Sequence, residues 1–544
     1  MWARSAAVLA PDGCAEGAGK APVQAARFRR FWRAIPRPLR AAMVRAVAGL
    51  CNPLTGNRWA AALLLGYAVL WTISATIRNL GVPVHGDMAE AFALSRDFSL
   101  GYFKHPPLVN WITAAWFAVM PVAQWPFFLL GCLNAALAMG AVWLAAGYVV
   151  DARRRILAVA LLGLTPIFTF IPATFNHNTI QLSLWALVAL SFLASIERTK
   201  LGWSILFGLA CGLAILAKYF AGVIVLTCIL ASLLHPNRRS YWRSPRPYLA
   251  GVVCVTVLAP NLYWLINADF ISIRYQIAIQ PDNDAAKVIL LIFRCLGAFL
   301  AYLAPALLAI WLYLRPAKGT MTFLEGWPPP RPVIACIAFA PVLLSLAAFA
   351  VAGIGMPDAW IQPGYFFAPL AIISAPGLFV PRRAVTAIFG AATALAMLAV
   401  IASPLLMVVN FFSDRVVGVE PFAPLARFAT DAWHSRTKQP LQFVSGTRFA
   451  AWSVSFYSED HPRVFPVFGI FPVDAQTENH WSKHGTLGIC HSDESWCNEV
   501  LARALPDAER LEIMLPITFL GMNRGAVRYV LYLAHDGSDH ATSR

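Results

Sequence analysis

The sequence predicts an all-α polytopic membrane bundle followed by a small C-terminal α/β domain outside the membrane. Three observations predict it: 59% of the 544 residues are hydrophobic, only 13% are charged, and the mean hydropathy is +0.61. Soluble globular chains carry roughly 45–50% apolar and about 25% charged residues. The composition therefore excludes a soluble enzyme, a disordered scaffold and a fibrous repeat.

The chain is strongly basic, with 43 Lys and Arg against 27 Asp and Glu and a net charge of +16. In a soluble protein this balance would suggest nucleic acid. In a membrane protein it indicates positive cytoplasmic loops and contact with anionic membrane lipids, so we expect no nucleic-acid partner. The ten cysteines show no zinc-finger spacing, and most fall in apolar segments.

Eleven apolar runs approach the roughly 20 residues that a helix needs to cross the hydrocarbon. They lie near 59–79, 127–149, 157–174, 179–197, 203–217, 219–234, 248–267, 288–314, 333–352, 363–380 and 384–410. A further run, Leu108–Met120, is short for a span. We expect it to lie as a helix at the outer interface, because crossing there would export the cluster Arg153–Arg155.

The basic clusters determine the expected orientation. In the eleven-span arrangement they all lie on the side of the N-terminus, at residues 1–58, 153–155, 198–200, 238–246, 315–331 and 382–383. The positive-inside rule then predicts a cytoplasmic N-terminus, and the odd number of spans places the C-terminal tail outside.

The chain therefore divides into three expected parts. Residues 1–58 form a cytoplasmic basic leader with an amphipathic helix near 24–50, unless that segment is disordered or the start codon is placed too early. Residues 59–410 form the transmembrane module, with its first outer loop at 80–126. Residues 411–544 form an external soluble domain, in which 441–444 and 527–532 alternate as strands do. There an oxidising compartment would allow Cys490 and Cys497 to form a disulfide, the alternative being two free thiols.

The first outer loop holds two carboxylates. Asp87 and Glu90 are three residues apart, so on a helix they share a face. Such a pair suits general-base chemistry or a metal. The same spacing also fits a capping box, with Asp87 as N-cap and Glu90 three residues on. Spacing alone favours the capping box, although one residue can serve both roles.

Cationic and amide side chains follow in the expected outer loops. Lys104 and His105 precede Pro106-Pro107, and their cationic side chains could bind a phosphate. The alternative is that Lys104 and Tyr102 only anchor the chain at the membrane interface. Asn176, His177 and Asn178 suit sugar hydroxyls or cap helix ends. Lys218, next to Tyr219, is a candidate phosphate ligand or a snorkelling lysine, and Arg274 is a candidate for an anionic headgroup. The sequence contains no phosphate-binding glycine loop and no HExxH motif, which argues against an ATP-driven pump and such a metalloprotease.

Taken together, these loops resemble the GT-C membrane glycosyltransferases of the family 39/83 group. This group includes protein mannosyltransferases, the lipid A aminoarabinose transferase and rhizobial galacturonosyltransferases. The resemblance rests on Asp87-x-x-Glu90, Gly101–Leu108, Asn176–Thr179 and Leu216–Phe220, and it covers roughly residues 59–235.

The resemblance implies a GT-C type bundle that transfers a sugar from a polyprenyl-phosphate donor at the outer face, with inversion at the anomeric carbon. It implies that Asp87 is the catalytic base, that Glu90 is its acidic partner, and that Lys104 or His105 and Lys218 contact the donor phosphate. Many relatives have an acidic residue where this chain has Lys104, and some have a carboxylate where it has Asn176–Asn178. Both differences weigh against a bound metal, with a divalent cation left as an alternative.

We therefore expect a glycosyltransferase of a bacterial inner membrane, with its C-terminal domain in the periplasm and an envelope glycolipid of the lipopolysaccharide core or lipid A type as acceptor. In this interpretation Tyr102, Asn176, His177, Asn178 and Tyr219 bind substrate, and Arg274 joins the phosphate contacts. The alternatives are a protein O-mannosyltransferase, a transporter or flippase of polyprenyl-linked sugars, and an envelope assembly protein. Charges gathered in outer loops and a large external tail favour an enzyme over a transporter.

Overall fold

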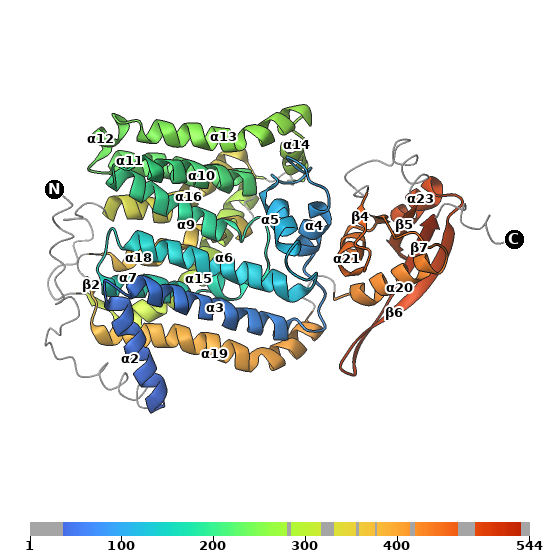
Figure 1. Cartoon of the computed structure of the whole chain (residues 1–544), viewed down its shortest axis with the longest axis horizontal. Helices are drawn as coiled ribbons and strands as arrows, with labels where there is room; N and C mark the ends of the chain where they lie inside the picture. The colour runs from blue at the N-terminus through green and yellow to red at the C-terminus, as the bar shows by residue number, and fades with distance from the viewer. Residues whose placement is uncertain are drawn as a thin grey trace.

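A computed structural model describes residues 36–279, 284–316, 331–354, 358–375, 378–413, 419–465 and 485–534. Long helices run side by side in a bundle, and a five-stranded sheet domain packs at one end of it (Figure 1). We call this the domain end. The opposite end, where helix α2 (Arg37–Cys51) lies across the bundle, is the α2 end.

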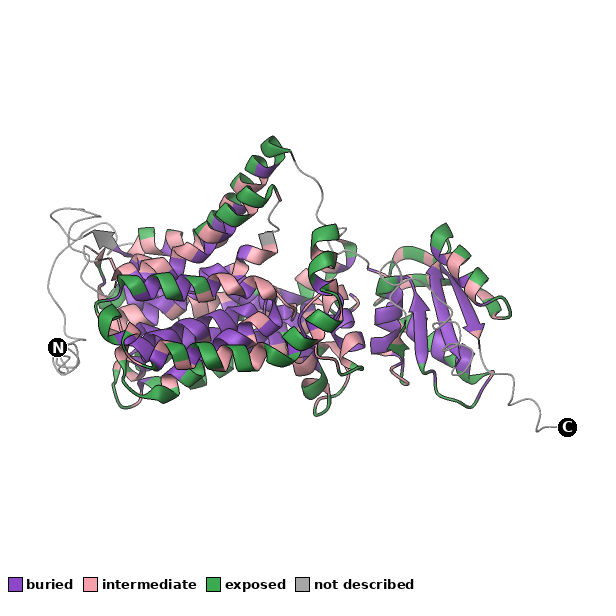
Figure 2. Cartoon of the chain, turned by 90° about the horizontal axis from the view of Figure 1, so that it is seen from above, coloured by how far each residue is buried: buried purple, intermediate pink, exposed green. Residues whose placement is uncertain are grey.

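Six described helices are long and apolar enough to cross a membrane. They are α3 (Gly56–Arg78), α6 (Gln124–Ala146), α13 (Arg246–Asn267), α15 (Ala285–Tyr313), α16 (Arg331–Ala352) and α19 (Arg382–Phe412). On the outer helices, large apolar side chains are exposed, such as Val255 at 60% and Ile401 at 74% (Figure 2). Soluble monomers rarely expose such continuous apolar surfaces, so the bundle is that of a multi-pass membrane protein.

One predicted span is broken. It consists of helix α7 (Ala152–Leu162) followed by α8 (Pro166–Thr169) and η3 (Ile171–Ala173). These segments are long and apolar enough to cross a membrane only when taken together, and the chain bends by 81° between them. The break falls at Thr165, whose extended backbone (ψ 140°) is the conformation that a following proline imposes. The apolar run at 157–174 therefore lies on bent helical segments rather than on one continuous helix, and whether it crosses the membrane stays a prediction.

Shorter apolar helices complete the bundle. They are α9 (Gln181–Glu197), α10 (Leu201–Ala217), η4 (Tyr219–Ala221) with α11 (Gly222–Leu234), and α17 (Asp358–Ile361), η5 (Gln362–Tyr365) and α18 (Ala368–Ile373). All eleven predicted runs thus fall mainly on helices, although the number that cross stays a prediction. Helix α5 (Leu108–Phe117) has ten residues, about 15 Å, which is half the hydrocarbon thickness. It lies at the domain end (Figure 1), as an interfacial helix would.

Basic segments gather at the α2 end. Helix α12 (Arg238–Trp242) and strand β2 (Leu378–Phe379), which pairs with β1 (Arg315–Pro316), both lie there (Figure 1). Arg154 joins them, because its guanidinium donates to the carbonyls of Ile373 and Leu378 at 3.0 and 2.8 Å. The shared end agrees with the grouping of basic clusters inferred from the sequence.

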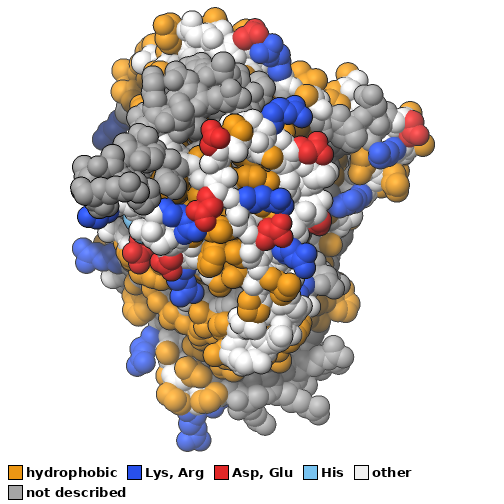
Figure 3. Space-filling view, turned by 90° about the vertical axis from the view of Figure 1, so that its right-hand side faces the viewer, with side chains coloured by type: hydrophobic (Ala, Val, Ile, Leu, Met, Phe, Trp, Pro, Cys, Tyr) orange, Lys and Arg blue, Asp and Glu red, His pale blue; other side chains and the backbone are white. Residues whose placement is uncertain are grey.

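The C-terminal domain is an α/β sheet of order β4-β3-β5-β7-β6. Strands β3 (Phe443–Gly446), β4 (Arg463–Val464) and β5 (Thr486–His491) are parallel, whereas β6 (Glu509–Phe519) and β7 (Met522–Ala534) form an antiparallel hairpin. Its helices are α20 (Phe422–His434), α21 (Arg448–Tyr457) and α23 (Ser495–Ala504). A disulfide between Cys490 and Cys497 joins β5 to α23. Acidic and basic side chains intersperse over this end of the molecule, as on a water-exposed surface (Figure 3).

The domain packs on the first loop of the bundle. Helix α21 lies against α4 (Gly86–Ser95), and Phe456 makes an edge contact with Phe92, with ring centroids 5.2 Å apart. The Tyr457 hydroxyl accepts a hydrogen bond from the Val84 amide at 2.7 Å. A Cβ on Gly86 would lie 2.4 Å from the ring of Phe449, so a larger residue at this position would require that ring to move. The sheet domain therefore fixes the position of α4.

We expect Phe456→Ala to destabilise the protein by about 3–5 kcal/mol, because it empties a site enclosed by aromatic rings from both parts of the chain. Thermal unfolding in detergent micelles measures the change. The control is Phe428→Ala in α20, where the ring is 37% exposed and little should change. Equal shifts for the two variants would contradict this account of the packing.

Candidate active site

The first turn of α4 presents a carboxylate to the domain end. His85 caps the helix, since its Nδ1 accepts from the Asp87 amide at 3.2 Å. Asp87 is therefore inside the helix and the capping-box interpretation is wrong. Its carboxylate instead accepts a hydrogen bond from the side-chain amide of Asn176 at 2.9 Å.

Asn176 is held in place by its own loop. Its Oδ1 accepts from the backbone amides of Asn178 and Thr179, both at 2.9 Å. This turn leaves the Nδ2 group free to donate to Asp87. Asn176 thus both closes a turn before α9 and orients the Asp87 carboxylate.

Glu90 and Lys104 form an ion pair within the same cluster, with Nζ and Oε2 2.8 Å apart. Burial raises the pKa of Glu90, and the Lys104 charge partly opposes this rise. For Lys104, burial lowers the pKa, but attraction to Glu90 outweighs it and the net pKa is raised. Lys104 therefore stays cationic. The other oxygen of Glu90, Oε1, is buried and has no hydrogen-bond partner among the described residues.

Two imidazoles stack beside this pair. The ring centroids of His105 and His177 lie 4.0 Å apart, with the rings tilted by 30°. Burial lowers the pKa of both rings well below the usual value, and the charges of Lys104 and Lys218 lower it further. Both rings are therefore neutral at pH 7. The Nε2 of His177 is buried and unpartnered within the part of the chain that the structure describes.

Lys218 reaches the cluster from the link between α10 and η4. Its Nζ donates to Oδ1 of Asn178 at 2.5 Å and lies 3.8 Å from the ring centroid of Trp360. Sequence reasoning missed Trp360, because nothing in the short segment before the tenth apolar run marks it. Burial lowers the pKa of Lys218 well below its usual value, and the Asp87 carboxylate opposes part of this fall. The face of Trp360 favours the protonated amine, as a bound anion would.

The remaining predicted residues have other partners. Tyr102 donates to the Asp97 carbonyl at 2.7 Å, and Tyr219 donates to Asn261 at 3.0 Å. Arg274 pairs with Asp269 at 2.6 Å and is 61% exposed. We define the site cluster as the predicted residues that the structure brings together: Asp87, Glu90, Lys104, His105, Asn176, His177, Asn178 and Lys218.

Helix α14 (Ile271–Ala278) supports this cluster from outside, which the sequence did not indicate. Gln276 donates to the Lys104 carbonyl at 3.1 Å, and Ser272 donates to the Tyr102 carbonyl at 2.6 Å. Among the described residues, no group of three or more His, Cys, Asp or Glu is arranged to hold a metal ion. The cluster combines the Asp87 carboxylate and the Glu90–Lys104 ion pair with the buried Lys218 and two neutral imidazoles.

Comparison with known proteins finds similarity to membrane glycosyltransferases. Residues 104–264 match the family described as dolichyl-phosphate-mannose-protein mannosyltransferase. The chain is 25% identical over 325 residues to the lipopolysaccharide core galacturonosyltransferase RgtB of Rhizobium johnstonii, covering 57% of this chain and 64% of RgtB. It is 26% identical over 194 residues to the lipid A galacturonosyltransferase RgtD of the same organism, covering 35% of this chain and 40% of RgtD. The chain thus spans less than two thirds of these relatives.

A solved structure shares the fold. The crystal structure of ArnT from Cupriavidus metallidurans bound to undecaprenyl phosphate superposes with a TM-score of 0.55 at 14% identity, covering 86% of this chain and 97% of ArnT. The resemblance to the GT-C membrane glycosyltransferases, inferred from the loop motifs, is confirmed by these matches. The particular relatives within that class are the rhizobial galacturonosyltransferases and ArnT.

We expect Lys104→Met to destabilise the protein by about 3 kcal/mol, because it leaves Glu90 buried without its counter-ion. The double variant Glu90→Gln/Lys104→Met should recover most of this loss. The pKa of Glu90, already raised by burial, rises further without Lys104. The folded single variant then binds more protons than the unfolded chain, so its stability should increase as pH falls from about 8 to about 5. Thermal unfolding across this range measures both effects, and a double variant no more stable than Lys104→Met would contradict them.

Proposed function

We propose that the protein is a glycosyltransferase that moves a sugar from a polyprenyl-phosphate donor to a cell-envelope glycolipid of the lipopolysaccharide core or lipid A type. We place the domain end, and so the site cluster and the C-terminal domain, at the outer face of a bacterial inner membrane. The observation that carries the proposal is the convergence of Asp87 with Lys104 and Lys218 at one end of an apolar bundle.

Such a transfer needs one base and cations for a phosphate, since the donor carries its own leaving group. Asp87, oriented by Asn176, accepts the proton of the acceptor hydroxyl. The hydroxyl oxygen then bonds to the anomeric carbon as the bond from that carbon to the phosphate oxygen breaks. A single displacement of this kind inverts the configuration. Lys104 and Lys218 balance the charge that grows on the departing polyprenyl phosphate.

The neutral imidazoles have a complementary role. His105 can donate one hydrogen bond to a phosphate or sugar oxygen without adding charge, whereas His177 donates its one N–H to the Pro106 carbonyl and can accept from a sugar hydroxyl at Nε2. The unpartnered Nε2 of His177 and Oε1 of Glu90 are the buried polar atoms that a bound substrate would satisfy. The relatives named for lipopolysaccharide core and lipid A, and the undecaprenyl phosphate bound to ArnT, support this choice of acceptor and donor.

A second candidate, a protein O-mannosyltransferase, is favoured by the family description matched at residues 104–264. The two candidates share a donor class and differ in acceptor. Mass spectrometry of glycolipids and of glycoproteins from cells with and without the protein distinguishes them.

We expect Asp87→Asn to lower transfer by about 10²–10⁴-fold, the range for loss of a general base. Asn keeps an oxygen that can accept from Asn176, so the fold should persist. Asp97→Asn is the control, because Asp97 is a largely exposed carboxylate that pairs with Arg463. Glycolipid masses from cells at matched expression give the result. A sugar retained by Asp87→Asn but lost in the deletion strain would show that Asp87 is not the base.

We expect Lys218→Met to raise the KM for the polyprenyl-phosphate donor by about 10- to 100-fold. The variant loses a hydrogen bond to a charged group, which contributes roughly 1.5–3 kcal/mol to binding. The KM for the acceptor should change little. Lys200→Met, an exposed lysine before α10, serves as the control. Initial rates with purified protein at varied donor concentration measure the effect. A change confined to the acceptor KM would reassign Lys218.

A further inference from the structure

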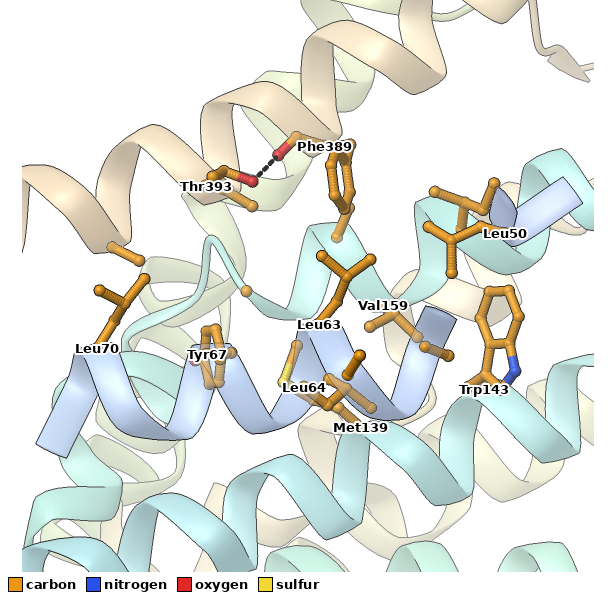
Figure 4. A pocket seen from close by; sticks show the side chains of 18 residues that line it. Leu50, Leu63, Leu64, Tyr67, Leu70, Met139, Trp143, Val159, Phe389 and Thr393 are labelled. Carbon is orange, nitrogen blue, oxygen red and sulfur yellow. Dashed lines mark hydrogen bonds between the residues drawn. The ribbon is translucent and has the colours of Figure 1, made fainter. Parts of the chain in front are cut away.

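An apolar groove runs along α3 in the half of the bundle near the α2 end. It has a volume of about 230 Å³ and lies between α3, α6, α7 and α19. Figure 4 shows Leu50 and Trp143 together at one end of it and Leu70 at the other, with Phe389 of α19 facing Leu63 of α3.

The lining of the groove offers a ligand only apolar contacts. Three lining side chains carry a polar group, and each group is already bonded to the protein. The Tyr67 hydroxyl donates to the Phe168 carbonyl, the Thr393 hydroxyl donates to the Phe389 carbonyl at 3.0 Å, and the Trp143 indole donates to Asn57 at 2.9 Å (Figure 4). Because α3, α6 and α19 are candidate membrane spans, the apolar molecule available to fill this groove is the hydrocarbon chain of a lipid.

A group of arginines on α2 lies next to the Leu50 end of the groove. Arg37, Arg40 and Arg45 share one face of α2 with Val44, at the helical spacing i, i+3, i+7 and i+8, and the helix contains no acidic residue. The buried residues of α2 are Ala46, Val47 and Leu50, and Val47 follows Arg40 by seven residues, about two turns. Arg45 precedes Leu50 by five residues, about 7.5 Å along the axis, which is within the length of one lipid molecule.

We propose that the groove and the arginine face of α2 together bind one anionic phospholipid, with an acyl chain between α3 and α19 and the phosphate on Arg40 and Arg45. Guanidinium groups suit phosphate oxygens, and the complete absence of acidic residues on α2 removes competing ion pairs. The site lies at the opposite end of the bundle from Lys104 and Lys218, so it is distinct from the proposed donor site. The lipid would join α2 to the bundle, and this inference does not depend on the proposed sugar transfer.

Gly66 allows a direct test, because a Cβ built there meets no atom within 4 Å and a larger side chain would enter the groove. The matched control is Gly251 in α13, another exposed glycine with equally open space that does not line the groove. Native mass spectrometry of the full chain compares retention of phosphatidylglycerol with that of phosphatidylcholine of equal chain length. We expect one phosphatidylglycerol on the wild type and at least tenfold lower retention in Gly66→Leu, with Gly251→Leu like the wild type.

A second variant distinguishes binding of the phosphate headgroup from binding of the acyl chain. Arg40→Gln/Arg45→Gln should abolish the preference for phosphatidylglycerol over phosphatidylcholine, whereas Gly66→Leu should weaken retention of both lipids. Equal retention of the two lipids by the wild type would overturn the proposal. So would unchanged retention in Gly66→Leu, or displacement of the phospholipid by polyprenyl phosphate, which would assign the groove to the donor.

Discussion

The site depends on a partly buried ion pair, that of Glu90 and Lys104, formed at the end of an otherwise apolar bundle. Removing two charges from water is costly, and the cost is met only when each charge has a close partner. Here the pair joins α4 to the loop before α5, and Gln276 holds that loop by the Lys104 carbonyl. The ion pair and this hydrogen bond together link α4, the loop before α5 and the distant α14. Asp87, one turn before Glu90, is carried by the same helix α4.

The two ends of the bundle use cations differently. At the domain end, Lys218 is buried, held by Asn178 and by the face of Trp360. Burial lowers the pKa of this lysine well below its usual value, so an anion held close to it favours its protonated form. At the α2 end, Arg37 and Arg45 are exposed and hydrated. Exposed guanidinium groups suit headgroups at a membrane surface. The proposed donor site and the proposed phospholipid site would thus use buried and exposed cations, respectively.

The sequence predicted what depends on local composition. Apolar runs predicted the helices, and the break at Thr165 was missed although Pro166 marks it. The structure brings most of the predicted loop residues together, whereas the sequence did not indicate which of them are partners. Asp87 and Asn176 are separated by 89 positions, and spacing rules describe only neighbours three or four residues apart. The capping box failed for the same reason, since His85 was a better-placed cap and the loop at 174–179 supplied the partner of Asp87.

The C-terminal domain is part of the site's support rather than an independent appendage. Its helix α21 covers α4, with Phe449 over Gly86 and Phe456 among the rings of Phe92 and Phe127. The charge of Arg448 also acts on Glu90 and opposes the rise in its pKa. Because α4 is a short helix of ten residues, it has little stability of its own and depends on packing from both sides. The carboxylate of Asp87 is therefore positioned jointly, by the amide of Asn176 from the bundle and by the aromatic face of α21 from the sheet domain.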